Sequence, residues 1–339
     1  MNKNKLHINI LNVISAISFV ILHINSSYWK TNIYNQGWIN NNIIENIFSF
    51  GPIIFFMISG ATLLDFYDNY DLKEYFRRRI IKTFIPYIFW SILAFFFTFY
   101  FEKSFDDLSL TNFISCLLEG KAIVAYWFFI PLFNIYLSIP LIAAIKKDMR
   151  KKVFTYILIV AYIFNILIPF INIAFNINLG YSFLVYAATS YLIYIFLAYL
   201  IEYNEIDYKY RLIIYVAGII SIILCTTISN NITLIDNQYN NLSPFTMIYV
   251  SAIYIFIKYI SRRLEKNIIL IKIIEFLKKY SFAIYLLHWF ILVFLLNIIK
   301  IDPDLLSYRI LGFIPIIIIV ILITYLIRKI PFVGKALLP

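Results

Sequence analysis

Two histidines lie within long apolar stretches of the chain. His23 follows Phe19-Val20-Ile21-Leu22, and His288 follows Ile284-Tyr285-Leu286-Leu287. An ionisable group at bilayer depth is costly, so such a residue usually has a function. Imidazole can take up and return a proton near neutral pH, which suits general acid–base chemistry. A histidine that only hydrogen-bonds to a neighbouring helix is the alternative, but two such residues in a chain with three histidines favour chemistry.

Other catalytic arrangements have little support in the sequence. The stretches around the two histidines contain no carboxylate, which argues against a Ser-His-Asp triad. Cys116 and Cys225 lie in different segments without the spacing of metal ligands, so we expect free thiols and no metal site.

A second candidate site is the basic run Arg77-Arg78-Arg79, which directly precedes an apolar stretch. Such a run can fix membrane orientation and contact anionic lipid. It could instead hold the phosphates of a cytoplasmic cofactor, because guanidinium binds phosphate oxygens with two parallel hydrogen bonds. Three consecutive side chains point around a helix, so at most one or two of them can face one ligand.

The elements that position these residues are long apolar segments. The chain has 339 residues, of which 62% are hydrophobic and 14% charged. The segments have the length of about 20 residues that a transmembrane helix needs, and they are too uniformly apolar for barrel strands. We therefore predict an all-α polytopic membrane protein with about ten transmembrane helices. The predicted spans are 8–28, 44–64, 80–101, 122–145, 153–174, 179–201, 211–229, 243–260, 279–299 and 308–327.

The net charge of +11 is explained by topology. With the N-terminus inside, the predicted spans place 24 of the 29 Lys and Arg residues on the cytoplasmic side, as the positive-inside rule requires. Both termini are then cytoplasmic, and no nucleic-acid partner is needed. We expect one integral-membrane domain over residues 1–339. The amphipathic segment 264–279 is expected to lie on the inner leaflet, or to act as a lid over a cytoplasmic site.

Five motifs resemble the acyltransferase 3 family of bacterial membrane acyltransferases, and within it the compact enterobacterial common antigen O-acetyltransferase type. They cover nearly the whole chain. The motifs are Leu22-His23 followed by Tyr28-Trp29, Phe55-Phe56-Met57-Ile58-Ser59-Gly60, Arg77 to Ile80 with Pro86, Trp127-Phe128-Phe129 with Tyr136 and Pro140-Leu141, and Tyr280-Ser281-Phe282-Ala283-Ile284-Tyr285-Leu286-Leu287-His288.

The resemblance implies a bacterial inner-membrane O-acyltransferase with no permanently bound cofactor. It would take an acyl group, expected to be acetyl, from a cytoplasmic acyl-CoA and deliver it to a hydroxyl of a polysaccharide or lipid-linked sugar. Such a protein contacts membrane lipid, and the resemblance leaves open whether it forms homo-oligomers. The implied residues are His23 as general base or acyl carrier with His288 as a further polar contact, Asn12, Arg77, Arg78 and Arg79 for the donor, and Tyr28, Trp29, Trp127 and Tyr285 for the acceptor.

The sequence departs from the family pattern at two positions. Asn12 stands where the family usually has an arginine eleven residues before its histidine, and Ala125 stands where a histidine often precedes the Trp-Phe motif. An amide cannot neutralise a phosphate as a guanidinium does. Arg77 or Arg79 could compensate, the donor could differ, or activity could be lost. A transporter of a glycan precursor or small acid is the alternative from another functional class.

Overall fold

The computed structural model describes residues 6–25, 36–102, 108–175, 177, 183–231, 243–302, 305–331 and 334–339. Within these ranges every regular element is helical, so the predicted all-α class is confirmed. The elements of the first half are α1 (Leu6–Ile24), α2 (Gln36–Phe48), α3 (Phe50–Leu63), η2 (Phe66–Asp68), α4 (Leu72–Arg79), η3 (Ile80–Phe84), α5 (Ile85–Phe97), η4 (Thr98–Glu102), α6 (Leu110–Glu119), η5 (Val124–Phe128) and α7 (Phe129–Ala143). Those of the second half are α8 (Lys147–Ala161), η6 (Tyr162–Leu167), α9 (Ile168–Ala174), η7 (Tyr186–Ala188), α10 (Leu192–Tyr203), α11 (Tyr208–Asn231), α13 (Pro244–Leu264), α14 (Ile268–Lys278), α15 (Ser281–Asn297), α16 (Leu306–Leu311), α17 (Phe313–Arg328) and α18 (Gly334–Leu337).

Several helices are long and apolar enough to cross a membrane. Among the described residues there are seven, or eight if α14 and α15, which meet at a bend of 58°, form one broken span. A multi-pass membrane protein is therefore supported. The two remaining predicted spans correspond to the shorter apolar helices α10 and α17. The count of ten spans and the cytoplasmic termini stay predictions.

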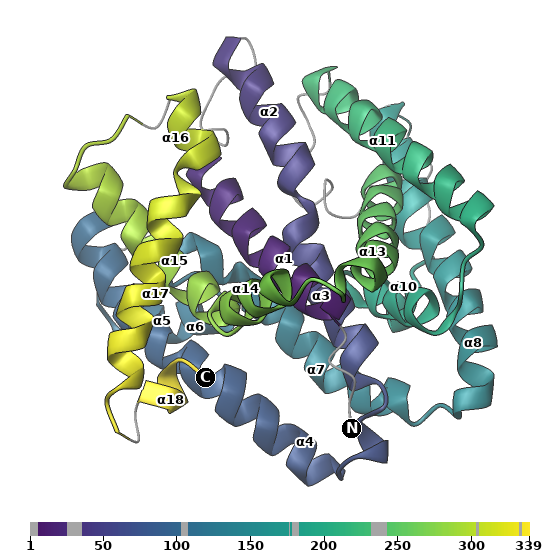
Figure 1. Ribbon diagram of the computed structural model, residues 1–339, viewed down its shortest axis with the longest axis horizontal. Helices are drawn as coiled ribbons and strands as arrows, with labels where there is room; N and C mark the ends of the chain where they lie inside the picture. Colours follow the sequence, from purple (N-terminus) through teal and green to yellow (C-terminus); the bar gives the residue numbers. More distant parts are fainter. Residues whose placement is uncertain are drawn as a thin grey trace.

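α1 lies at the centre of the bundle (Figure 1). It packs against α3, α13, α14 and α15. Its apolar residues occur on all sides of the helix, and Leu11, Phe19 and Val20 are almost fully buried. A helix that is apolar all round is buried rather than half exposed. The fold therefore places His23, in the last turn of α1, inside the protein.

α3 and α10 approach each other closely at Gly60. A Cβ atom at this position would lie 2.6 Å from the backbone oxygen of Ile195. A backbone atom cannot move aside as a flexible side chain can, so only glycine fits. The small residues of Ser59-Gly60-Ala61 thus serve close helix packing, as is common between membrane helices.

Two π-helical segments each end two residues before a proline. Pro86 follows η3, and Pro169 follows η6. Proline lacks the N–H that would bond four residues back, and its ring crowds that carbonyl. Widening the helix by one residue in this turn accommodates the ring, so each helix continues after its proline.

The predicted helix over 179–201 begins too early. Residues 183–191 are irregular apart from the short η7, and the helix α10 begins at Leu192. Backbone groups of this irregular segment bond to a side chain instead. The amide of Asn165 donates to the carbonyls of Val185 (3.0 Å) and Ala188 (3.2 Å), and its oxygen accepts from the Val185 N–H (2.9 Å). Irregular backbone is tolerated at membrane depth where the protein satisfies it in this way.

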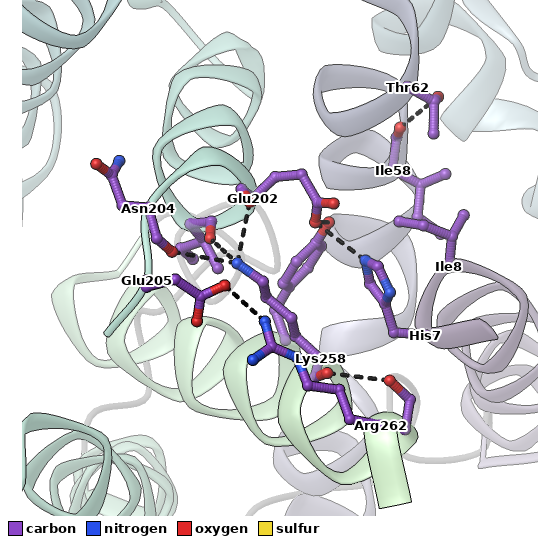
Figure 2. Close-up of polar contacts among 12 residues, drawn as sticks. His7, Ile8, Ile58, Thr62, Glu202, Asn204, Glu205, Lys258 and Arg262 are labelled. Atoms are coloured by element: carbon purple, nitrogen blue, oxygen red, sulfur yellow. Dashed lines mark hydrogen bonds and ion pairs between the residues drawn. The ribbon is translucent and has the colours of Figure 1, made fainter. Parts of the chain in front are cut away.

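Buried ionic groups join α1, α10 and α13 (Figure 2). Lys258 is 5% exposed and donates to the carbonyls of Ile201 (2.7 Å), Glu202 (3.0 Å) and Asn204 (3.2 Å) at the end of α10. The Glu202 carboxylate in turn accepts from His7 Nε2 at 3.0 Å. A cation at a helix C-terminus satisfies carbonyls that have no partner within the helix. This cluster fixes the end of α1 opposite to His23.

Replacing Lys258 with methionine is expected to destabilise the bundle by about 3 kcal/mol, because it leaves the backbone carbonyls that Lys258 bonds without this donor. The measurement is the thermal unfolding temperature of the detergent-solubilised protein. Lys209→Met, at an exposed position, is the control. Equal unfolding temperatures for the two variants would show that the cluster contributes nothing to stability.

Candidate active site

The two intramembrane histidines form a hydrogen-bonded pair. His23 is 3% exposed and His288 is fully buried. The Nδ1 atom of His23 lies 3.0 Å from Nε2 of His288, although the residues are 265 positions apart. The pair exists because α1 and α15 pack side by side. Two residues that the sequence marks separately for chemistry therefore share one site.

The backbone determines which ring nitrogens carry hydrogen. Nδ1 of His288 lies 2.9 Å from the carbonyl of Ile284 and 2.8 Å from that of Tyr285. A carbonyl only accepts, so this Nδ1 is protonated, and in the neutral ring Nε2 holds the lone pair. Nε2 then accepts from Nδ1–H of His23, which also lies 2.9 Å from the carbonyl of Phe19. The lone pair of a neutral His23 is therefore on Nε2, as a general base requires.

Aromatic rings surround the pair. Phe19 stacks on His23 with ring centroids 6.2 Å apart, and Trp289 meets His23 edge-on at 5.4 Å. The Tyr285 ring lies 4.8 Å from that of Phe19 and 6.1 Å from that of His288. The site is thus enclosed by apolar faces, where water is excluded and electrostatic interactions are strong.

A cavity of about 730 Å³ lies next to this aromatic enclosure. Phe55, Phe128 and Tyr285 line the cavity, and each of their rings also contacts Phe19. Tyr285 therefore forms part of the cavity wall and touches His288. The histidine pair is separated from the cavity by the thickness of one aromatic side chain.

Four basic side chains line the same cavity, and no acidic side chain among the described residues does. They come from three places in the chain: Arg79 at the end of α4, Lys278 and Lys279 at the turn between α14 and α15, and Arg328 at the end of α17. These ends lie in the same region as the C-terminus (Figure 1). Concentrated positive charge in a concave apolar site favours a ligand with an anionic end and an apolar end.

The three consecutive arginines diverge, as the sequence predicts. Arg77 and Arg78 bond to Glu74 on the exposed face of α4, at 2.6 Å and 2.7 Å. Arg79 instead lies in the cavity wall, with its guanidinium 5.3 Å from the ring centroid of Tyr136. Its buried Nε–H has no acceptor in the described part of the chain. Of the predicted donor-binding arginines, Arg79 alone lines the cavity.

Asn12 also lines the cavity, with its amide donating to the carbonyl of Ile8 at 3.0 Å. Arg328 is held by backbone carbonyls at the cavity edge: its Nη2 donates to Lys279 O and its Nε to Leu338 O, both at 2.9 Å. Asn12 brings no charge to the cavity, and the basic side chains that line it come from other helices and from the turn between α14 and α15.

The family model described as an acyltransferase domain, of the acyltransferase 3 type, matches residues 6–329. The chain belongs to the acyltransferase 3 family. No curated protein and no solved structure matches the chain. Membership supports a membrane acyltransferase, and the resemblance of the sequence motifs to this family is confirmed at family level.

The remaining predicted residues of this acyltransferase are placed as follows. Tyr28 and Trp29 lie outside the described residues. Trp127 is half-buried and packs against Tyr191, with ring centroids 6.0 Å apart, rather than in the cavity wall. The hydroxyl of Tyr285 donates to the backbone oxygen of Ala125, so it is the ring of Tyr285 that faces the cavity.

Sequence reasoning missed three of the four basic residues of the cavity. Lys278, Lys279 and Arg328 were interpreted as charges that set topology. Each of them lies at the end of an apolar segment, and this position alone does not distinguish a side chain in a cavity wall from one that contacts lipid. Phe19 was also missed, and its signal was available: it lies four residues before His23 and so on the same face of the helix.

Proposed function

We propose that this acyltransferase is a transmembrane O-acyltransferase of the bacterial inner membrane, moving an acetyl group from cytoplasmic acetyl-CoA to a hydroxyl of a surface or lipid-linked glycan. The observation that carries the proposal is the His23–His288 pair one side chain away from a basic cavity. Resemblance to the enterobacterial common antigen O-acetyltransferase type supports acetyl as the group and a glycan as the acceptor.

In this proposal the cavity holds the acyl-CoA. Arg79, Lys278, Lys279 and Arg328 contact its phosphates, and the unpaired Nε–H of Arg79 donates to one of them. Charge-assisted hydrogen bonds to phosphate are among the stronger polar contacts in proteins. The apolar wall formed by Phe55, Phe128 and Tyr285 accommodates the pantetheine arm and directs the thioester toward the histidines.

The chemistry then needs one base. Nε2 of His23 takes the proton of the acceptor hydroxyl as its oxygen attacks the thioester carbonyl. The new C–O bond forms and the C–S bond breaks, and the CoA thiolate receives the proton. His288 accepts the Nδ1–H of His23 and stabilises the imidazolium that forms transiently. An acyl group carried on His23 is a two-step version of the same transfer.

Membrane vesicles with the protein test this function directly. Given acetyl-CoA labelled in the acetyl group, they are expected to transfer the label to glycan in a base-labile linkage. Absence of label from the glycan, with the label still on acetyl-CoA, would contradict the proposal. Unmodified glycan that crosses the membrane only when the protein is present would support transport instead.

Arg79→Ala is expected to raise the KM for acetyl-CoA by about 10–100-fold, the loss that follows when a hydrogen bond between charged groups is removed. Arg77→Ala is the matched control, because Arg77 is on the same helix but bonds to Glu74 away from the cavity. Equal KM values in the two variants would remove Arg79 from the donor site.

A further inference from the structure

Beyond the histidine pair, directly after α1, lies a second group of polar residues: the buried Asn25 and, from α2, the buried Asn41 and the half-buried Glu45. Asn25 is fully buried and Asn41 is 1% exposed. The Asn25 amide donates to the backbone oxygen of Asn41 at 2.9 Å and to the carboxylate of Glu45 at 3.3 Å. Asn41 and Glu45 are four residues apart, so they lie on the same face of α2.

Two oxygen atoms of this cluster lack donors. The side-chain oxygens of Asn25 and Asn41 are buried, and neither accepts a hydrogen bond from the described part of the chain. A buried acceptor without a donor is destabilising, and such groups in a native protein call for an explanation. A ligand with O–H groups would supply the missing donors.

The position of the cluster along α1 is informative. Asn12 marks the basic cavity, His23 follows eleven residues later, and Asn25 lies two residues beyond His23. At about 1.5 Å per residue, the cluster lies roughly 20 Å from Asn12 and about 3 Å past His23. The histidine is therefore between the basic cavity and the cluster, which suits a donor and an acceptor that approach from opposite ends.

Residues two apart on a helix point to different sides, so Asn25 faces α2 while His23 faces α15. The cluster would thus contact a part of the acceptor next to the hydroxyl that reacts. Binding energy from such a non-reacting part positions the reacting group.

We propose that Asn25, Asn41 and Glu45 form an orienting subsite for the acceptor, with the sugar hydroxyls donating to their oxygens. This inference rests on the proposed acyl-transfer function. Two amide oxygens and a carboxylate accept hydrogen bonds from O–H groups and repel phosphate. The subsite therefore recognises the polyhydroxylated ring of the acceptor and not the phosphate of a lipid carrier.

Asn41→Leu tests the subsite, because no described residue donates to the Asn41 side-chain oxygen. The protein is reconstituted in liposomes with the glycolipid extract of a host strain that lacks the gene, and the initial rate of transfer from labelled acetyl-CoA is measured. Removing one hydrogen bond is expected to raise the apparent KM for the extract by about 3–10-fold. The KM for acetyl-CoA is expected to stay unchanged.

Asn40→Leu is the matched control, because Asn40 is the neighbouring residue and is exposed. Asn41→Ala is the second variant if Asn41→Leu unfolds at a lower temperature than the wild type. An unchanged KM for the extract in a stable Asn41 variant, or an equal change in Asn40→Leu, would overturn the subsite. Absence of transfer by the wild type would overturn the proposed function, so the two failures are distinguishable.

Discussion

Replacing His23 with alanine is expected to lower the rate of acyl transfer by about 10²–10⁴-fold, the usual contribution of a general base. The ring is nearly completely buried at the end of the central helix, and its Nε2 carries the lone pair that the reaction uses. Alanine leaves α1 helical and apolar, so membrane insertion is expected to be normal. The measurement is the initial rate with labelled acetyl-CoA, normalised to the amount of protein in the membrane.

His7→Gln is the control for the removal of a histidine from α1. His7 is at the opposite end of that helix and bonds to Glu202, and glutamine keeps an N–H that can reach this carboxylate. Its transfer rate is expected to remain within about 3-fold of the wild type, the scale of one weak hydrogen bond. A His23→Ala variant that inserts normally and transfers at the wild-type rate would exclude His23 as the base.

Replacing His288 with phenylalanine is expected to slow transfer by about 10–100-fold, less than the loss of the base itself. Phenylalanine keeps the ring volume but removes the acceptor at Nε2, so the Nδ1–H of His23 loses His288 and keeps the carbonyl of Phe19. His288→Gln restores an acceptor oxygen near the position of Nε2 and is expected to retain more activity than His288→Phe. Equal activities of these two variants would show that the hydrogen bond between the histidines has no role in the reaction.

The histidines illustrate how far the sequence alone can go. Apolar surroundings and residue chemistry were sufficient to select His23 and His288, because a buried ionisable group is informative at any position of a membrane helix. Their direct hydrogen bond was not predicted, and His288 was expected to be only a further polar contact. Which two helices pack together depends on shape complementarity over both surfaces, and one sequence does not reveal this.

The basic residues show a similar division. The divergence of Arg77, Arg78 and Arg79 follows from helical geometry and was predicted. Pairing of Arg77 and Arg78 with Glu74 was also accessible, since these residues are three and four positions apart on one helix. Convergence of Arg79 with Arg328, from helices separated by more than two hundred residues, is a tertiary property that no local pattern encodes.

The helical class was predictable because apolar segments of about 20 residues are typical of membrane-spanning helices. The start of α10 was not, because hydropathy does not distinguish a membrane helix from irregular chain whose backbone bonds to a buried side chain. Asn165 performs that function here. The residues next to a single asparagine in an apolar segment do not indicate that its side chain bonds to the backbone of another segment.

The measurement that tests the account most directly is mass spectrometry of surface glycans from a deletion strain complemented with the wild type or with His23→Ala. We predict that a base-labile acetyl group is absent from the deletion strain, returns with the wild type, and does not return with His23→Ala. Identical acetylation in all three strains, with equal amounts of glycan at the surface, would contradict transfer to this class of acceptor.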